Sequence, residues 1–216
     1  MPSGAQMTPS YIYFIYGLSV MFYSMMAWFF FKKNRETLPR LVGVLMAVLA
    51  LQCLKDLFFF ESGTGWGDRG WMIMTSVDMV SVPLYAFILI ELCRPGLLKP
   101  SAIAVHELPF VVLPTLFALT DSRVFYYADV SWAAVYGFGY AVWTVVNIPK
   151  YHAMLRLRFS YDDNINLNWL RYILVSFFVI LSLWILDCMV IDFDIEALYM
   201  CGTLVIWMFI CYFIYP

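Results

Sequence analysis

Charged residues are scarce in this sequence, since 13 Lys and Arg and 15 Asp and Glu make up only 13% of its 216 residues. A soluble domain carries about 25% charged residues, whereas 63% of this chain is hydrophobic. The formal net charge of −2 lacks the basic excess that proteins use to bind nucleic acid, so we expect no direct nucleic-acid contact by this segment. This composition indicates an integral membrane protein.

The usual signatures of catalysis and cofactor binding are also missing. No GxSxG, Walker or dinucleotide-binding pattern is present. The stretch HELPF starts like the zinc motif HExxH, but Phe110 stands where the second histidine would be. His106 and His152 are too few for a three-histidine zinc site, and the five cysteines form no CxxC pair. We therefore expect neither an enzyme nor a bound cofactor.

Long apolar runs, in contrast, are abundant. A helix needs about 20 apolar residues to cross a bilayer, and seven runs reach or approach that length. The N-terminal MPSGAQMTPS lacks the basic start of a signal peptide, so we expect the first run to stay in the mature protein. Because the linkers are short, the sequence predicts one all-α integral membrane domain over 1–216, a bundle of seven transmembrane helices. The expected helices are 9–31, 41–60, 71–93, 101–120, 131–149, 167–190 and 195–215.

Lys and Arg are distributed unequally between the two sides of the predicted bundle. Ten of them fall on one side, in or beside its linkers, while only Arg69 and Arg123 fall in linkers on the other. Cytoplasmic loops carry the excess of Lys and Arg in membrane proteins. The sequence therefore predicts that the N-terminus lies outside and the C-terminus lies in the cytoplasm.

Four ionisable residues interrupt the apolar runs near the outer side, namely Lys55, Asp56, Asp78 and Asp187. At about 1.5 Å per residue they lie roughly 5–10 Å below the outer boundary. An unpaired charge there would cost roughly 2.5–3.5 kcal/mol on insertion scales. We therefore expect all four to point inward, with Lys55 neutralising one of the acids. Three interpretations are open: a polar clamp that sets helix packing, a water-accessible pocket for a small polar ligand, or an ion or proton path.

Aromatic side chains share helix faces with these charges and would form the walls of a pocket open to the outside. One lysine against three aspartates gives the cluster a formal charge of −2, which mildly favours a cationic or amine-bearing ligand. A raised carboxyl pKa would remove that preference. The predicted wall residues are Tyr85, Tyr136, Tyr140, Trp143, Trp184 and Tyr199.

A row of small residues, Ala133, Gly137 and Ala141, recurs every four positions in the run 131–149. Such rows allow helices to approach closely. The row predicts close packing either inside the bundle or against a second copy in a homodimer.

Two segments resemble known membrane sensors. YDDNINLNWLRYILVSFF (161–178), together with YIYFIYGLSVMFYSMMAWFF (11–30), resembles the membrane sensor regions of Bacteroidota regulators. In those proteins a seven-helix domain precedes a cytoplasmic AraC-type helix-turn-helix or histidine-kinase module, whereas this sequence ends at Pro216 without one. The resemblance implies signal reception in a bacterial inner membrane and a cytoplasmic effector, but it identifies no ligand.

The sequence thus predicts a sensor or receptor domain that binds a small polar ligand from the outside and signals to a cytoplasmic effector, a transcription regulator in the family it resembles. A small-solute secondary transporter is the alternative. Prolines inside the predicted helices, such as Pro83, Pro109 and Pro114, favour the transporter, and the lack of internal repeats counts against it. An intramembrane enzyme ranks third, and a purely structural membrane subunit also stays open.

Overall fold

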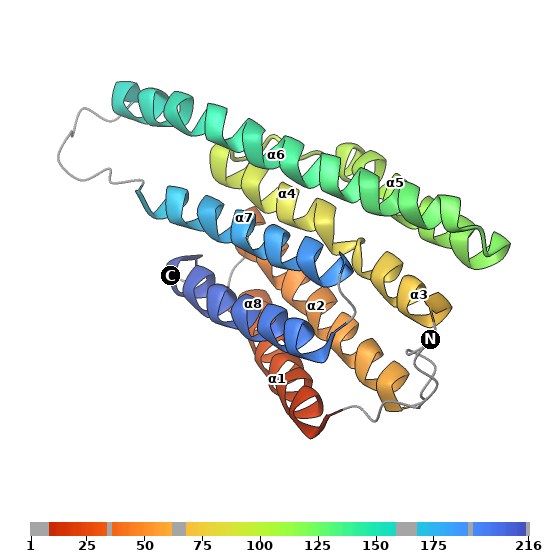
Figure 1. Ribbon diagram of the computed structural model, residues 1–216. Helices are drawn as coiled ribbons and strands as arrows, with labels where there is room; N and C mark the ends of the chain where they lie inside the picture. The colour runs from red at the N-terminus through yellow and green to blue at the C-terminus, as the bar shows by residue number, and fades with distance from the viewer. Residues whose placement is uncertain (1–8, 34–35, 62–67, 159–167, 190–191, 215–216) are drawn as a thin grey trace.

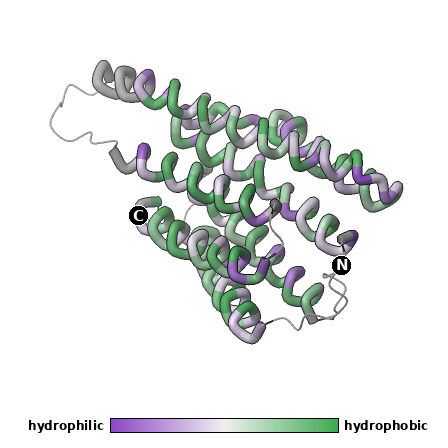
Figure 2. Tube along the Cα trace, viewed as in Figure 1, coloured by the Kyte–Doolittle hydropathy of each residue, from purple (hydrophilic) through white to green (hydrophobic). Residues whose placement is uncertain are grey.

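The computed structural model describes residues 9–33, 36–61, 68–158, 168–189 and 192–214, and every regular element in these ranges is a helix. The helices lie side by side in a bundle with their axes close to one common direction (Figure 1). Hydrophobic residues run along most of each helix (Figure 2). The helices are α1 (Ser10–Lys33), α2 (Thr37–Glu61), α3 (Asp68–Asp78), α4 (Ser81–Cys93), α5 (Pro100–Thr120), α6 (Arg123–Arg158), α7 (Asn168–Met189) and α8 (Phe193–Ile214).

Five stretches of the described chain are long and apolar enough to cross a membrane, which is the pattern of a multi-pass membrane protein. The third of these stretches contains both α3 and α4. The sequence also predicts spans at α6 and α7, which fall outside this set. Tyr, Trp and Gly, which are less apolar than Leu or Val, are frequent in the middle of α6. The five stretches are Ser10–Lys32, Thr37–Phe60, Arg69–Cys93, Pro100–Thr120 and Phe193–Tyr212.

Helix α4 is the centre of the bundle. Eleven of its 13 residues are buried, and it packs against α2, α5, α6 and α7. Its sequence is apolar on all sides, as a helix surrounded by other helices requires. Helix α5, in contrast, buries only Phe110 and Phe117 and lies beside α6 at the edge of the bundle (Figure 1).

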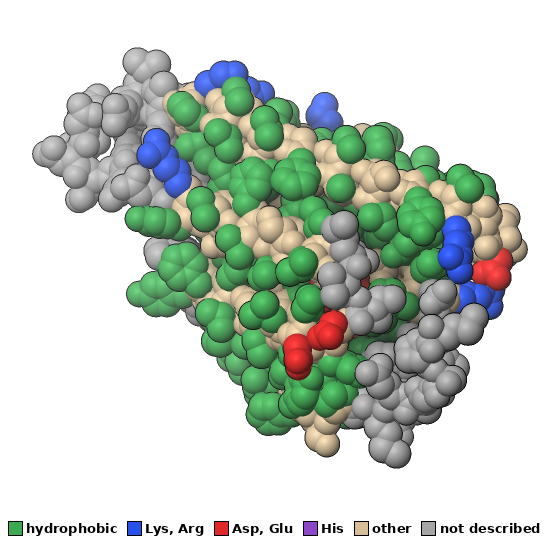
Figure 3. Space-filling model, in the orientation of Figure 1, with side chains coloured by type: hydrophobic (Ala, Val, Ile, Leu, Met, Phe, Trp, Pro, Cys, Tyr) green, Lys and Arg blue, Asp and Glu red, His purple; other side chains and the backbone are tan. Residues whose placement is uncertain are grey.

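Apolar side chains cover much of the face that Figure 3 shows. Phe14, Trp28 and Leu119 are 72%, 66% and 78% exposed. A soluble monomer rarely leaves large contiguous apolar areas in water. Such a surface is suited to contact with lipid.

The predicted span 71–93 is broken at residues 79–80 into α3 and α4, and Pro83 explains the break. Proline has no N–H group, so the carbonyl of Met79 loses its regular partner four residues later. The N–H group of Val82 turns to this carbonyl, at 3.0 Å. In a regular helix the N–H group of Val82 would donate to the carbonyl of Asp78. The carbonyl of Asp78 is therefore left without its helical partner.

Helix α6 is much longer than predicted, because it covers Arg123–Arg158 rather than 131–149. At its start, Tyr126 is buried against Phe117 of α5, with ring centroids 5.8 Å apart. At its other end, Pro149 lies inside the helix without ending it. The predicted start was wrong because the polar first turns of α6 are stabilised by packing against α5 rather than by burial in lipid.

Helices α1 and α2 approach each other closely at Gly43, and this close approach generates a stability prediction. A Cβ atom at Gly43 would lie 3.2 Å from Phe30 Cβ and 3.2 Å from the Phe31 ring. We expect Gly43→Leu to lower the free energy of unfolding by about 1–3 kcal/mol, the usual cost of overpacking. Thermal unfolding of the protein in nanodiscs would measure this change.

Gly17→Leu is the matched control, since a Cβ atom at Gly17 on α1 meets nothing within 4 Å. We expect this variant to unfold at the wild-type temperature. Equal unfolding temperatures for Gly43→Leu and Gly17→Leu would show that α1 and α2 do not pack in this way.

Candidate functional site

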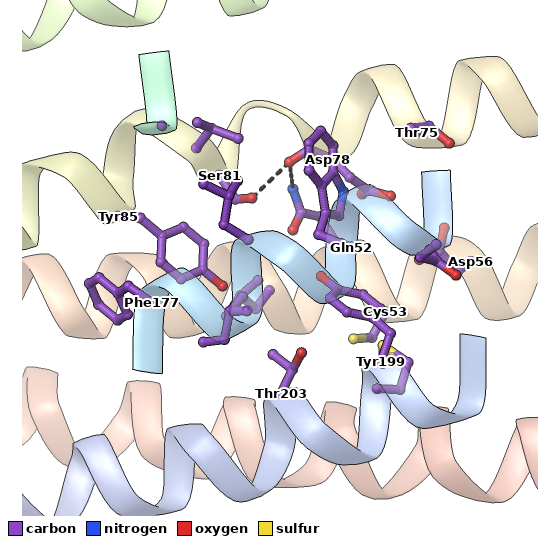
Figure 4. A pocket seen from close by; sticks show the side chains of 18 of the residues that line it. Gln52, Cys53, Asp56, Thr75, Asp78, Ser81, Tyr85, Phe177, Tyr199 and Thr203 are labelled. Carbon is purple, nitrogen blue, oxygen red and sulfur yellow. Dashed lines mark hydrogen bonds between the residues drawn. The ribbon is translucent and has the colours of Figure 1, made fainter. Parts of the chain in front are cut away.

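The break between α3 and α4 leaves a backbone carbonyl that side chains must satisfy. The carbonyl oxygen of Asp78 accepts one hydrogen bond from Gln52 Nε2 of α2, at 3.0 Å, and one from Ser81 Oγ of α4, at 2.8 Å (Figure 4). A free carbonyl is costly where water is absent. Gln52 and Ser81 therefore stabilise the broken helix and attach it to α2.

Lys55 forms a second attachment between α2 and α3. Its ammonium nitrogen lies 2.8 Å from Asp78 Oδ1 and 2.9 Å from Asp56 Oδ1. It also donates to the carbonyl oxygen of Met74, at 3.0 Å. Lys55 therefore donates hydrogen bonds to Asp78 Oδ1 and the Met74 carbonyl and forms an ion pair with Asp56. The sequence prediction that an acid on another helix neutralises Lys55 is confirmed by Asp78.

A second group of acids lies where α7 and α8 meet. Asp187 of α7 does not pair with Lys55, and its carboxyl group interacts instead with that of Glu196 on α8. Glu196 also accepts a hydrogen bond from the hydroxyl of Tyr16 on α1. Both carboxyl groups are buried. Helices α1, α7 and α8 are thereby joined by polar contacts inside the bundle.

Glu196 was not predicted as a site residue because it lies at the edge of the last apolar run, where it reads as a boundary. A signal was nevertheless present in the sequence. Glu196, Tyr199 and Thr203 are spaced three and four residues apart, so they share one face of α8.

The two acid groups face a common cavity of about 130 Å³, which is lined by all the helices except α5. Figure 4 shows polar and aromatic side chains from several helices converging on it. Lys55 is not among the lining residues, but it pairs with two of them, Asp56 and Asp78. Tyr16 and Tyr23 of α1 also line the cavity. The predicted site residues in the lining are Asp56, Asp78, Asp187, Tyr85, Tyr140, Trp184 and Tyr199.

Tyr136 and Trp143 do not line this cavity but a second hollow between α4, α5 and α6. There the hydroxyl of Tyr136 lies 2.9 Å from His106 Nδ1, and the guanidinium of Arg94 lies 5.9 Å from the centre of the Trp143 ring. Tyr140 lines both spaces. The placement of Tyr136 and Trp143 in one pocket with the acids is therefore corrected.

The small-residue row explains this difference. Ala133 and Ala141 are buried, and a Cβ atom at Gly137 would lie 3.4 Å from Leu181 of α7 and 3.9 Å from Val82 of α4. The row therefore packs inside the bundle, which was one of its two interpretations. Because this face of α6 turns towards α4 and α7, the neighbouring aromatic face turns towards α5.

The cavity has an excess of acceptors. Four carboxyl groups, those of Asp56, Asp78, Asp187 and Glu196, surround it with a single nearby lysine. Asp187 Oδ1 and Thr203 Oγ1 are buried without a hydrogen-bond partner among the described residues. Such unpaired groups cost free energy unless a ligand or water completes them. The arrangement can bind a small molecule that donates hydrogen bonds.

No group of three His, Cys, Asp or Glu side chains within the described ranges could hold a metal ion. No protein-family model, curated protein or solved structure matches this chain. The resemblance to membrane sensor regions therefore stays a prediction, and the functional proposal depends on the geometry and chemistry of the site.

The ion pairs of Lys55 generate a prediction about stability. In Lys55→Met, Asp56 and Asp78 lose their cation in the interior of the bundle, where an unpaired charge costs about 3–5 kcal/mol. We expect a loss of this size in the free energy of unfolding. Chemical denaturation of the protein in matched detergent micelles would measure it.

Arg69→Met is the control, because the Arg69–Asp121 pair has the same kind of contact, at 2.7 Å, but its side chains are 61% and 59% exposed. Exposed pairs contribute about 0–1 kcal/mol. If the two variants lost equal stability, burial would not govern the Lys55 pairs.

Proposed function

We propose that this chain is the membrane-embedded domain of a sensor, and that a small polar ligand from the outside binds in the cavity between the acids. The observation that carries this proposal is the cavity itself, with the buried and unpartnered atoms Asp187 Oδ1 and Thr203 Oγ1 in its lining residues. A clamp that only sets helix packing would gain from pairing these atoms within the protein. Their incomplete pairing favours a ligand site.

Seven membrane spans are part of the proposal. They comprise the five long apolar stretches, of which one joins α3 and α4, together with α6 and α7. The ten Lys and Arg residues of one side and the two of the other support an outside N-terminus and a cytoplasmic C-terminus. The resemblance to Bacteroidota sensors supports a bacterial inner membrane as the location.

Signalling would follow from the position of the ligand between α3, α7 and α8. A ligand shifts a conformational equilibrium only when it binds one state more tightly than the other. Asp78 lies on α3 and Glu196 on α8, so the distance between their carboxyl groups depends on how these helices are placed. A ligand that contacts both groups would bind more tightly to the state in which this distance fits it. We propose that the resulting change passes to a cytoplasmic effector through the segment 150–166 and the C-terminus. Residues 159–166 and 215–216 of that route lie outside the described residues.

A small-solute transporter is the second candidate, and the broken helix favours it. Transporters often place substrate sites at discontinuous helices, and here the break at residues 79–80 adjoins Asp78. Tyr140 lines both the cavity and the second hollow, so the two spaces adjoin. Adjoining spaces suit a path for a solute and so support the same candidate.

Thermal stabilisation of the nanodisc-embedded protein by a library of small polar metabolites tests the ligand site. We expect at least one compound to raise the unfolding temperature of the wild type. Lys55→Ala and Asp78→Asn should reduce that stabilisation, because both disturb the acids that line the cavity, whereas Arg69→Ala should not. Undiminished stabilisation in both cavity variants would refute the site.

Uptake of the stabilising compound into proteoliposomes separates the two candidates. A sensor is expected to bind the compound without moving it across the membrane. Accumulation that requires the protein and is lost in Asp78→Asn would establish the transporter instead.

The orientation has a direct test by fusion of reporters within the linkers. Fluorescent protein folds in the cytoplasm, and alkaline phosphatase is active outside it. We expect fluorescence from fusions after Leu98, in the linker 94–99, and phosphatase activity from fusions after Asp121, in the linker 121–122. The opposite pattern would invert the topology and place the cavity near the cytoplasmic side.

A further inference from the structure

We infer that the ligand of the cavity carries a protonated amine, and that Asp187 together with Glu196 is the group that binds it. This inference rests on the proposed function, because it names the chemical class of the ligand for the same cavity. It follows from the balance of charges, the unpartnered atoms and the size of the space.

The charges divide into two unequal groups. Asp56 and Asp78 share the ammonium of Lys55, which lies within 3 Å of both. Asp187 and Glu196 have no Lys, Arg or His partner within 4.0 Å among the described residues. The α7–α8 side of the cavity is therefore the side that lacks a cation.

Two of the four unpartnered atoms in the described lining residues lie on this side, and the other two, Asp56 Oδ1 and Trp71 Nε1, lie on α2 and α3. Asp187 is 8% exposed and Thr203 is 3% exposed, and in each an oxygen has no hydrogen-bond partner among the described residues. The hydroxyl of Tyr16 already donates to Glu196 and holds that carboxyl group in place. An ammonium group offers three donors and no acceptor, which matches oxygens that lack donors. A carboxylate or phosphate ligand would meet like charges, and the indole N–H of Trp71 on α3, unpartnered among the described residues, is a single neutral donor against four carboxyl groups.

The size and walls of the cavity limit the rest of the ligand. A volume of about 130 Å³ is close to that of an engineered cavity, about 150 Å³, that binds benzene. The Tyr85 ring stands in its lining, packed edge-on against Phe177 with centroids 5.3 Å apart, and Trp207 donates to its hydroxyl at 3.3 Å. Aromatic faces attract cations and bind flat apolar groups. A small ring or short chain that bears one amine fits this space.

Three probes of nearly equal shape test the inference: benzylamine, benzyl alcohol and benzoate. Their binding to the full chain in nanodiscs is measured by isothermal titration calorimetry. We expect saturable binding of benzylamine, at least about tenfold tighter than that of the other two, because hydrogen bonds to charged groups are the stronger kind. Equal or tighter binding of benzyl alcohol or benzoate would overturn the inference.

Variants locate the binding group. Asp187→Asn and Glu196→Gln keep the shape of each side chain but remove its charge, and we expect each to weaken benzylamine binding at least about tenfold. Asp194→Asn is the control, since Asp194 lies two residues from Glu196 but is exposed. It removes a charge at the same helix end without touching the cavity lining. Unchanged benzylamine affinity in Asp187→Asn would overturn the assignment.

Thermal unfolding shows whether each variant is folded. If Asp187→Asn does not fold, Thr203→Val replaces it, because this variant removes only a hydroxyl group and should weaken benzylamine binding a few-fold. Unchanged affinity there would count against the inference.

The amine inference and the proposed function fail in different ways. If none of the three probes binds but a neutral or anionic metabolite stabilises the wild type and not Asp78→Asn, the inference fails and the ligand site stands. If neither the probes nor any metabolite binds, both fail.

Discussion

The ammonium group of Lys55 is the contact on which the polar interior depends. The Lys55 side chain is 19% exposed, and its ammonium lies within 3 Å of two carboxylates on α2 and α3 and donates to a backbone carbonyl as well. Charges in a low-dielectric interior are tolerated only when they are paired and their hydrogen-bonding capacity is filled. Lys55 is paired with both acids and hydrogen-bonded to two oxygens, so it allows Asp56 and Asp78 to lie beside a cavity.

Pro83 causes the break between α3 and α4, and this break adjoins the cavity. The missing N–H group of this proline shifts one hydrogen bond and releases the carbonyl of Asp78. Gln52 and Ser81 satisfy that carbonyl and hold the break in place. The break thus places a backbone carbonyl and the carboxyl group of Asp78 side by side in the interior of the bundle. Together these two groups supply polar atoms among apolar helices.

The sequence predicted the helices well and the site in part. Apolar runs bounded by turn residues define most helices to within a few residues, because lipid and burial demand the same composition. The estimated depths left Asp56, Asp78 and Asp187 as possible partners of Lys55, and the structure pairs Lys55 with the first two. The depths could not show that Asp187 interacts with Glu196, since that contact depends on how α7 and α8 pack. Tyr136 was assigned to the wrong space because the rotation of α6 is set by Gly137, not by the aromatic residues.

The break at residues 79–80 also has a mechanical consequence. Helix α3 has 11 residues and is about 16 Å long, and it is attached to α4 by only two residues that already lack regular helical bonding. A change in the angle between α3 and α4 would therefore be concentrated at this junction, and it would have to move the contacts of Gln52 and Lys55 with α3. Asp78 lies next to this junction, whereas the start of α3 at Asp68 lies farthest from it. A displacement of a fraction of an ångström at Asp78 would then move the start of α3 several-fold farther.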